Sequence, residues 1–363
     1  MRLLDAVNVP WRSLANGAPK SCKARPIRLH YFIRKPSRET FSIERLFDAI
    51  ISAIPEQRFV IRRLICPFHS TGIFRRILLI AWAAIRQGDI NHVTGDVDFL
   101  CLLMRRRRTV ITIHDINSLH RLRGLRRRVY ELFWLRLPLF RAGQVTTASE
   151  ASRAEIQPFA ARAARPIKVI PDCMTMRLEI QPKSFKCHLP RILHVGTKPN
   201  KNLERVIAAL RGVPCELVVV GKVTHEQTHL LDRSGIHYEN HVDLSDTALL
   251  DQYRAADLVV FVSTYEGFGL PILEAQAIGR PVVTSDHEPM RSVAGTGAKL
   301  VDPTDVDEIR RGIEDVIRNA ALRETLIEAG RRNVDRYSPA AVALQYASLY
   351  IEMYEEMHKC QGR

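Results

Sequence analysis

The chain has 363 residues, of which 46% are hydrophobic and 26% charged, as is typical of a globular protein with room for two domains. Its longest unbroken apolar run, Ile77–Ile85, is too short to span a bilayer, and the first residues lack the apolar segment of a secretory signal. Seven cysteines without a C-x-x-C pair indicate neither a zinc site nor a disulfide framework. We therefore predict a cytoplasmic protein with reduced thiols.

The net charge of +15 is unevenly distributed along the chain. Residues 1–185 hold 33 Lys and Arg against 14 Asp and Glu, whereas residues 186–363 hold 21 against 25. The first half is therefore strongly basic and the second half slightly acidic. Such a field attracts an anionic partner, for which nucleic acid, an acidic membrane and a phosphate-bearing substrate are the alternatives.

The first half begins with an aperiodic stretch, residues 1–26, that we expect to be a mobile leader. Apolar, β-branched runs then alternate with helical patterns, which indicates a parallel sheet with crossover helices. Strands are predicted at Ile27–Ile33, Phe59–Ile65, Asp89–Thr94, Thr109–His114, the start of Gln144–Ile156 and Ile167–Pro171, and helices near Ser42, over Gly72–Arg86 and after Ser149 as an N-cap.

Polar residues lie where two of these strands end. His114 and Asp115 close one strand, and Asp96 follows the neighbouring strand that contains His92. Because open α/β sheets bind ligands at the carboxyl ends of their strands, these side chains are candidates for a binding site. The alternative is structural, since a histidine at a strand end often bonds to nearby backbone.

The segment Asn117–Arg141 combines leucines and aromatic residues with several arginines. An amphipathic segment of this composition suits an anionic membrane surface. A buried helix with one charged face in water is an equally good interpretation of the same pattern.

The second half follows Met174–Leu189, a stretch without a clear period that we interpret as an interdomain linker. This predicts one domain at residues 27–185, a second at 186–339 and a C-terminal helical segment at 340–363. Strands are expected at Ile192–Val195, Glu216–Val220, Ile236–Val242, Leu258–Val262, Pro281–Thr284 and Lys299–Asp302, and helices at Leu203–Leu210, Ile272–Ile278, Val306–Tyr337 as a pair, and Ala340–Lys359.

Two loops of the second half join a strand to a helix. The loop Gly196–Asn202 contains Lys201, and Asn202 is placed to cap the helix that follows. The loop Thr264–Leu270 enters a helix for which Pro271 is a favourable first residue and Gly279 a natural stop. Backbone N–H groups at a helix start favour an anion.

The second loop also offers carboxylates. Glu266 lies in the loop and Glu274 in what we expect to be the first turn of the helix, while Gly267 and Gly269 allow a ligand to approach the backbone. Donors for phosphate and acceptors for hydroxyl groups together suit a phosphorylated sugar. The alternative is that Glu274 only complements the helix dipole and that the glycines only form a turn.

The full string resembles a family signature. Glu266-Gly267-Phe268-Gly269-Leu270-Pro271, then Glu274-Ala275, with seven residues between the glutamates, and Gly279-Arg280-Pro281-Val282-Val283 are similar to retaining GT-B glycosyltransferases that use nucleotide-sugars. The resemblance implies an α/β fold of two Rossmann-like parallel-sheet domains facing across a cleft. It further implies that the final helix crosses back to the first domain.

The resemblance also implies roles for individual residues. Thr197 stands where many relatives carry an arginine, so the contact with the donor diphosphate would depend mainly on Lys201, helped by Lys198 or a residue elsewhere. The implied catalytic set is Lys201, Glu266, His114 and Asp115; the implied donor-binding set is Gly196, Lys198, Lys201, Val242, Glu266, Gly267, Phe268, Gly269, Leu270 and Glu274, with His241 and Asp243 beside the base; the acceptor-side candidates are His92 and Asp96.

The resulting expectation is a hexosyltransferase of the mannose or glucose type that works with retention in surface polysaccharide biosynthesis. Its partners would be a GDP-, UDP- or ADP-linked sugar, a glycan or lipid-linked acceptor and an anionic membrane, with peripheral association at the inner face of the plasma membrane. We expect no cofactor and no metal, since Asp96 and Asp98 have suitable spacing but lie in the acceptor half. The alternatives are a sugar-nucleotide epimerase of the same fold and, less well supported, a basic nucleic-acid-binding protein.

Overall fold

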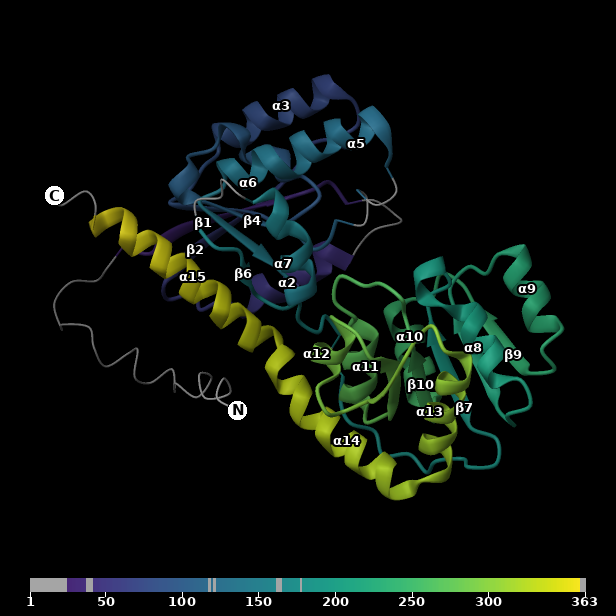
Figure 1. The fold of residues 1–363 in the computed structure, drawn as a ribbon. Coiled ribbons are helices and arrows are strands. Elements are labelled where there is room, and N and C mark those ends of the chain that lie inside the picture. Colours follow the sequence, from purple (N-terminus) through teal and green to yellow (C-terminus); the bar gives the residue numbers. More distant parts are fainter. Residues whose placement is uncertain are drawn as a thin grey trace.

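The computed structural model describes residues 25–36, 42–116, 119, 122–160, 165–176 and 178–359. The chain forms two α/β units, each built on a parallel sheet, and a long C-terminal helix that connects them (Figure 1). Residues 1–24 of the predicted leader and residues 360–363 of the predicted C-terminal segment lie outside the described residues.

The first sheet contains six parallel strands in the order β2-β1-β3-β4-β5-β6. Its central strands are short and fully buried because helices cover both faces, which is the usual environment of a parallel sheet. The strands are β1 Ile27–Ile33, β2 Phe59–Ile65, β3 Ile90–Val93, β4 Thr109–Thr112, β5 Gln144–Thr147 and β6 Lys168–Val169.

Helices and helical turns connect these strands. Within the predicted segment Asn117–Arg141, residues 124–141 form one continuous helical run whose middle, Glu131–Arg136, is π-helical, and residues 117, 118, 120 and 121 lie outside the described residues. The elements are α2 Ser42–Ala53, α3 Ile73–Ala84, η1 Asp98–Leu103, η2 Arg106–Arg108, α5 Gly124–Tyr130, η3 Glu131–Arg136, α6 Leu137–Arg141, α7 Glu150–Ile156 and η4 Gln157–Phe159.

The second sheet has the order β12-β11-β10-β7-β8-β9, again with all neighbours parallel. Counted from its first strand, this is the doubly wound order of dinucleotide-binding folds, in which the direction of winding reverses between β7 and β10. The strands are β7 Arg191–Val195, β8 Glu216–Val220, β9 His237–His241, β10 Leu258–Phe261, β11 Val282–Ser285 and β12 Lys299–Val301.

The helices of the second unit pack on both faces of this sheet. Three of them, α9, α10 and α12, are additional to those expected from the sequence. The elements are η5 Pro199–Lys201, α8 Leu203–Leu210, α9 His225–Asp232, α10 Asp246–Ala255, α11 Leu270–Ile278, α12 Met290–Ala294, α13 Val306–Arg318, α14 Ala320–Val334 and η6 Asp335–Tyr337.

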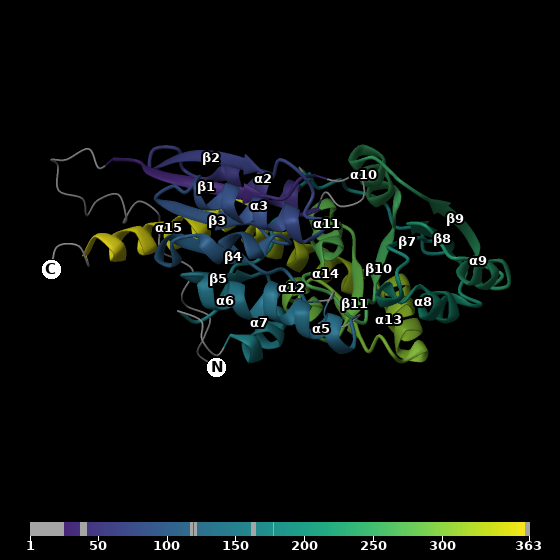
Figure 2. The same cartoon turned by 90° about the horizontal axis from the view of Figure 1, so that it is seen from above.

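The C-terminal helix α15, Pro339–Lys359, leaves the second unit and runs along the first (Figures 1 and 2). Its buried face joins the core of the first unit, where Tyr346 and Tyr350 pack with Phe47 of α2 and Tyr31 of β1. The opposite face of the first sheet is covered by α3, η1 and α6. The two units are therefore held together by a shared helix as well as by the linker between β6 and β7.

Two local predictions need correction. Asn202 precedes α8, but it adopts a left-handed conformation with φ of 66° and makes no side-chain cap; its Nδ2 donates instead to the carbonyls of Val262 and Pro303. Glu274 falls in the second turn of α11, because that helix begins at Leu270 with Gly269 as its N-cap. Among the described residues, no helix is both long and apolar enough to cross a bilayer.

Candidate functional site

The reversal point of the second sheet brings two loops together. The loop after β7 and the loop after β10 follow adjacent strands, and the backbone N–H of Thr264 donates to the carbonyl of Asn200 over 2.8 Å. The side chain of Asn200 donates to the carbonyl of Tyr265 over 3.0 Å. Ligands of doubly wound sheets bind at such a reversal point, and here its two loops are already fastened to each other.

Lys201 and Glu266 face each other at this point. Nζ of Lys201 donates to Oε1 of Glu266 over 2.7 Å and lies 4.6 Å from the ring centre of Phe261. The stem of the lysine runs over Gly196, where a Cβ would come within 2.8 Å of Lys201 Cγ. Gly196 has a φ of +99°, so glycine is required there both by the backbone and by the close approach of the lysine.

Glu274 lies on α11 close to these loops. Its Oε2 accepts a hydrogen bond of 2.6 Å from the hydroxyl of Tyr253, which is buried on α10. Burial raises the pKa of the Glu274 carboxyl, while the Tyr253 bond and the charge of Lys201 oppose that shift. Glu274 is thus a half-buried carboxyl with a defined orientation.

The residues between the two glutamates present backbone rather than side chains. The ring of Phe268 is only 6% exposed and packs edge-on against Tyr337, with the ring centres 5.7 Å apart. Gly269 adopts a φ of +116° as the N-cap of α11, and Leu270 is the first helical residue. The first N–H groups of a helix have no partner within the helix, so this turn offers donors to an anion.

Thr197 carries no charge into the site. Its hydroxyl donates to the carbonyl of Lys222 over 2.6 Å, and the residue is 9% exposed. Lys198 and Lys222 are both exposed beside it. Val242, which directly follows β9, is 44% exposed, and the backbone carbonyl of His241 accepts from Gly221. Val242 therefore remains a side chain that a ligand can contact at this edge of the sheet.

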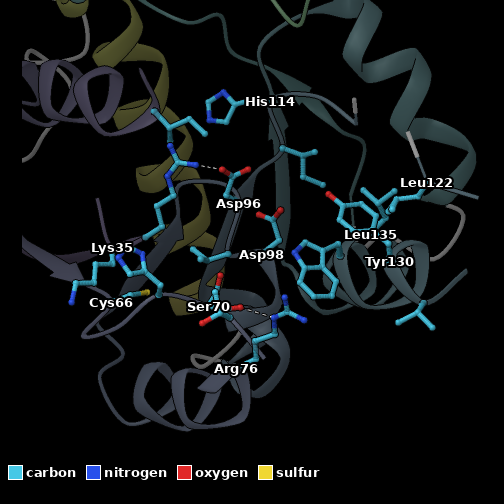
Figure 3. A pocket seen from close by; sticks show the side chains of 18 of the residues that line it. Lys35, Cys66, Ser70, Arg76, Asp96, Asp98, His114, Leu122, Tyr130 and Leu135 are labelled. Atoms are coloured by element: carbon cyan, nitrogen blue, oxygen red, sulfur yellow. Dashed lines mark hydrogen bonds and ion pairs between the residues drawn. The ribbon is translucent and has the colours of Figure 1, made fainter. Parts of the chain in front are cut away.

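The first unit contains a cavity of about 970 Å³ (Figure 3). It lies at the carboxyl ends of β1, β3 and β4, the edge that corresponds to the loops of the second unit. Polar lining residues come from the loops after β1, β2, β3 and β4 and from η1, α3 and α5, and they include Arg34, Lys35, Ser70, Arg76, Asp96, Asp98, His114, Asp115 and Arg126.

His114 is held by two acceptors. Nδ1 lies 3.4 Å from Oδ1 of Asp172, and Nε2 donates to the carbonyl of Thr94 over 3.1 Å. Burial opposes the charged imidazolium, but the charge and hydrogen bond of Asp172 outweigh it and raise the pKa of His114 to about 9. Because the ring is already protonated at neutral pH, His114 supplies a positive charge there rather than a base.

The second unit reaches the first at this histidine. A Cβ on Gly267 would lie 3.3 Å from Cβ of Asp115 and 3.4 Å from the carbonyl oxygen of His114. The hydroxyl of Ser152 lies 3.0 Å from the carbonyl oxygen of His114 and 3.4 Å from that of Gly267. The His114-Asp115 corner therefore touches the loop that carries Glu266, and the two halves of the predicted site meet.

Asp96 and Asp98 differ in their surroundings. Asp96 has a φ of +60° and pairs with Arg34, which also binds Glu44 (Figure 3). Asp98 is 6% exposed, and its Oδ1 has no hydrogen-bond partner among the described residues. Burial raises the pKa of Asp98 to about 8. Asp98 therefore brings to the cavity lining a carboxyl oxygen that no described residue bonds.

His92 does not reach the cavity, and the acceptor-side role predicted for it is wrong. The residue is completely buried, with Nδ1 2.6 Å from the hydroxyl of Tyr350 and Nε2 2.7 Å from that of Thr112. Burial lowers its pKa to about 3, so the ring stays neutral. Its function is structural, because it binds α15 to the sheet.

Residues 179–333 match the family model described as glycosyl transferases group 1. The match covers most of the second unit and less than half of the chain. The chain is 34% identical over 160 residues to O-antigen chain mannosyltransferase B of Escherichia coli, covering 40% of this chain and 42% of the relative. It is 28% identical over 231 residues to the MMP alpha-(1->4)-mannosyltransferase of Mycolicibacterium hassiacum, covering 60% and 56%. The chain thus matches about half the length of these relatives.

Solved structures extend the likeness to the first unit. Anabaena Alr3699/HepE, in its complex with UDP and glucose, aligns with a TM-score of 0.67 at 17% identity over 90% of this chain and all of that structure. WaaG, a glycosyltransferase involved in lipopolysaccharide biosynthesis, aligns with a TM-score of 0.63 at 15% identity over 89% and 99%. At these identities the likeness concerns the fold, and that fold is GT-B.

The sequence does not reveal several residues that position the candidate site. Asn200, Tyr253 and Asp172 hold Glu266, Glu274 and His114 in place, but each partner lies tens of residues away along the chain. Asp98 was noticed only as a metal ligand, since burial cannot be read from its neighbours in sequence. Among the described residues, no three His, Cys, Asp or Glu side chains converge as a metal ligand set.

Proposed function

We propose that the protein is a hexosyltransferase that moves a hexose from a nucleoside-diphosphate sugar to an acceptor hydroxyl, with retention. The observation that carries the proposal is the Lys201–Glu266 pair at the sheet reversal point, next to the corner where Gly267 meets Asp115. The mannosyltransferase relatives and the UDP complex of HepE support the choice of reaction and donor class.

In this proposal the donor lies across the two fastened loops. Lys201 and the N–H groups at the start of α11 stabilise the leaving diphosphate, and positive charge fixed in advance is the most effective form of such help. Glu266 accepts hydrogen bonds from the hexose hydroxyls, and Glu274 accepts from the ribose. Because Lys201 binds Glu266 in the structure, the arriving phosphate competes with a carboxylate for the ammonium group.

The transfer itself needs no residue as a covalent nucleophile. The acceptor oxygen bonds to C1 of the hexose on the face from which the diphosphate leaves, the bond between C1 and the phosphate oxygen breaks, and the acceptor proton passes to a phosphate oxygen. Protonated His114 and Asp115 lie beside the reacting centre, the first as a fixed charge and the second as an acceptor for a sugar hydroxyl. We propose that Lys198 or Lys222 replaces the charge missing at Thr197.

The acceptor would occupy the cavity of the first unit and be presented from a membrane. Apolar side chains on one face of α3 support this location, since Ile73, Phe74, Ile77 and Leu78 are between 54% and 80% exposed. Arg126, Arg127 and Arg128 on α5 add positive charge to the same unit. A glycan or lipid-linked acceptor of surface polysaccharide synthesis at the inner face of the plasma membrane fits these features.

Calorimetry with nucleoside diphosphates and their sugars tests the proposal. UDP, GDP and ADP are titrated separately, and one of them should bind to the wild type and bind at least about tenfold more weakly to Lys201→Ala, the effect of losing one charge-assisted hydrogen bond. Lys186→Ala, which removes an exposed lysine elsewhere in the second unit, is the matched control.

The product identifies the reaction. The protein is incubated with a panel of acceptors and with the hexose donors linked to whichever nucleoside diphosphate binds most tightly. The glycoside formed should have the same anomeric configuration as the donor, as measured by NMR. An isomerised nucleotide-sugar formed without acceptor would point to an epimerase instead. Equal nucleotide affinity in the wild type and Lys201→Ala would contradict the donor site.

A further inference from the structure

The cavity of the first unit contains cations that form no ion pair with a carboxylate among the described residues. Arg34 and His114 are paired with acids, but Lys35, Arg76 and Arg126 form no ion pair within the described part of the chain. They come from three separate elements, namely the loop after β1, helix α3 and helix α5. Cations gathered from separate elements around one hollow indicate an anionic ligand, because like charges in proximity repel unless a counter-charge binds.

Arg76 is fixed in position before any ligand arrives. Its guanidinium carbon lies 4.4 Å from the ring centre of Trp134, and its Nε donates to the carbonyl of Ser70 over 2.8 Å (Figure 3). Tyr130 stacks on Trp134 with an interplanar angle of 7° and ring centres 5.3 Å apart. These contacts engage the flat face and Nε of the arginine. The two Nη groups are left to donate to a ligand, and paired guanidinium N–H groups are a common way to bind phosphate.

The N-terminus of α3 adds a partial positive charge beside Arg76. Ser70 and Thr71 line the cavity just before the helix, whose first turn contains Arg75 and Arg76 and no acidic residue. Its N-cap, Gly72, provides no side-chain hydrogen bond to the first N–H groups. The helix dipole and Arg76 therefore favour an anion at the same end of the cavity.

Asp98 adds a carboxyl group to the lining of the cavity. In Figure 3 it lies between Asp96 and the Ser70–Arg76 pair, and its Oδ1 is buried without a partner. A buried polar atom without a hydrogen bond is costly, so the carboxyl of Asp98, which lines the cavity, gains by bonding to a group on the ligand. A hydroxyl suits Asp98 in either protonation state, because it can donate or accept.

We propose that this cavity binds a sugar acceptor that carries a phosphate or diphosphate group, with Arg76 and Arg126 holding the phosphate and Asp98 a sugar hydroxyl. The proposal rests on the proposed transferase function and specifies the chemical class of its acceptor. A cavity of about 970 Å³ is large enough for a sugar diphosphate, since pockets for ligands of that size have about 300–1,000 Å³.

Binding of small phosphates tests the site directly. Inorganic diphosphate and glucose 1-phosphate are titrated by calorimetry into the Lys201→Ala protein, which keeps these probes from the donor loops. Both should bind, and Arg76→Gln or Arg126→Gln should weaken them by about tenfold or more. Methyl glucoside, which lacks the phosphate, should bind much more weakly than glucose 1-phosphate, and Asp98→Ala should weaken glucose 1-phosphate but not inorganic diphosphate.

Neighbouring arginines provide matched controls. Arg75 belongs to the same turn of α3 as Arg76 and donates a hydrogen bond to Thr71, but it does not line the cavity. Arg127 follows Arg126 on α5 and does not line the cavity either. Arg75→Gln and Arg127→Gln should leave affinity within about twofold, because screened charges outside the site contribute little. Equal weakening by all four variants would mean diffuse attraction to a basic surface, and no binding to the Lys201→Ala protein would mean no phosphate site; both would overturn the proposal.

Three further measurements separate this inference from others. Arg76→Lys keeps a positive charge over the Trp134 ring, so it should bind glucose 1-phosphate more tightly than Arg76→Gln does. If Arg76→Gln does not fold, the affinity of Arg126→Gln for the same probe provides the test. Farnesyl diphosphate should compete with glucose 1-phosphate, whereas vesicles of phosphatidylglycerol should not, since a general attraction to acidic lipid would overturn a specific site. Nucleoside diphosphate should bind Arg76→Gln as it binds the wild type; its failure to bind the wild type would refute the transferase function instead.

Discussion

The side chain of Lys201 crosses Gly196, so closely that a Cβ at Gly196 would lie 2.8 Å from Cγ of the lysine. This contact lets the lysine leave its loop in the direction of Glu266. The glycine that begins the loop and the lysine near its end therefore act as a unit, although four residues lie between them in the sequence.

Gly196→Ala should consequently displace Lys201 and weaken binding of the preferred nucleoside diphosphate by about tenfold, in the range of a lost charge-assisted hydrogen bond. Gly212→Ala is the control, because Gly212 also has a positive φ, of +76°, but has nothing within 4 Å of the added Cβ. Both variants should lose thermal stability through backbone strain. Equal nucleotide affinity in the two variants would show that the contact with Lys201 does not matter.

Glu274→Gln should reduce turnover by at least about tenfold while the protein remains folded, because a neutral amide replaces an acceptor of charge-assisted hydrogen bonds worth about 1.5–3 kcal/mol. Tyr253→Phe removes the 2.6 Å bond that orients the carboxyl without touching the proposed ligand site. Its effect should be smaller and appear mainly in KM for the donor. Steady-state kinetics would detect both effects, and wild-type turnover in Glu274→Gln would remove this residue from the site.

The raised pKa of His114 should make the stability of the protein depend on pH. Its folded pKa of about 9 lies above the ordinary value of 6.5, so the stability it contributes is fully present below pH 6.5 and is lost as pH rises through 9. In Asp172→Asn burial is no longer opposed by the carboxylate, and the pKa should fall below the ordinary value.

NMR titration of the His114 ring measures this directly, and chemical denaturation of wild type and Asp172→Asn at several pH values gives the stability difference. That difference should be large near pH 6 and shrink toward pH 9 and above. His358, which bonds to the backbone of its own helix and has no carboxylate partner, serves as an internal reference in the same spectra. An unchanged His114 pKa in Asp172→Asn would contradict the ion pair.

The sequence predicts elements best where one local pattern decides them. Ile27–Ile33, Phe59–Ile65 and Glu216–Val220 match β1, β2 and β8 residue for residue, because each is a short apolar, β-branched run between turn signals. Ser149 also caps α7 as predicted, with its Oγ accepting from the N–H of Ser152. Interactions of this kind lie within a few residues of one another.

Packing between distant segments escapes such reasoning. The prediction for His92 failed because α15, which begins 247 positions later, covers it with Tyr350. Asn202 failed as a cap because its amide bonds instead to Val262 and Pro303, on two other loops. The glutamates, by contrast, could be located because the glycines and helix signals around them are contiguous in sequence.

Activity should survive EDTA if the proposed donor site is right, since Lys201, the start of α11 and protonated His114 would then supply positive charge to the donor phosphates without a divalent ion. The measurement is the initial rate of glycoside formation before and after chelation, with excess EDTA removed by desalting in one arm. A loss of activity that added Mg²⁺ restores would contradict this prediction and would require a ligand for the metal near the diphosphate.

The exposed face of α3 should anchor the first unit to acidic bilayers. Phe74 is 80% exposed and Ile77 54%, and inserting such side chains contributes about 1.5–3 kcal/mol each, while each basic residue near an acidic surface adds about 1 kcal/mol. Phe74→Asp and Ile77→Asp should therefore reduce co-sedimentation with anionic vesicles by about tenfold or more. Leu344→Asp, which changes a side chain 48% exposed on α15, should have little effect.

The charge component is tested separately with Arg127→Gln and Arg128→Gln, which lie outside the cavity. These variants should weaken binding to phosphatidylglycerol vesicles at moderate salt but change little at high salt, because the Debye length falls from about 10 Å at 0.1 M to about 3 Å at 1 M. Zwitterionic vesicles should bind weakly throughout. Equally weak binding to both lipid types, or anionic binding that none of the α3 and arginine variants alters, would show that the apolar face and the arginines serve another purpose.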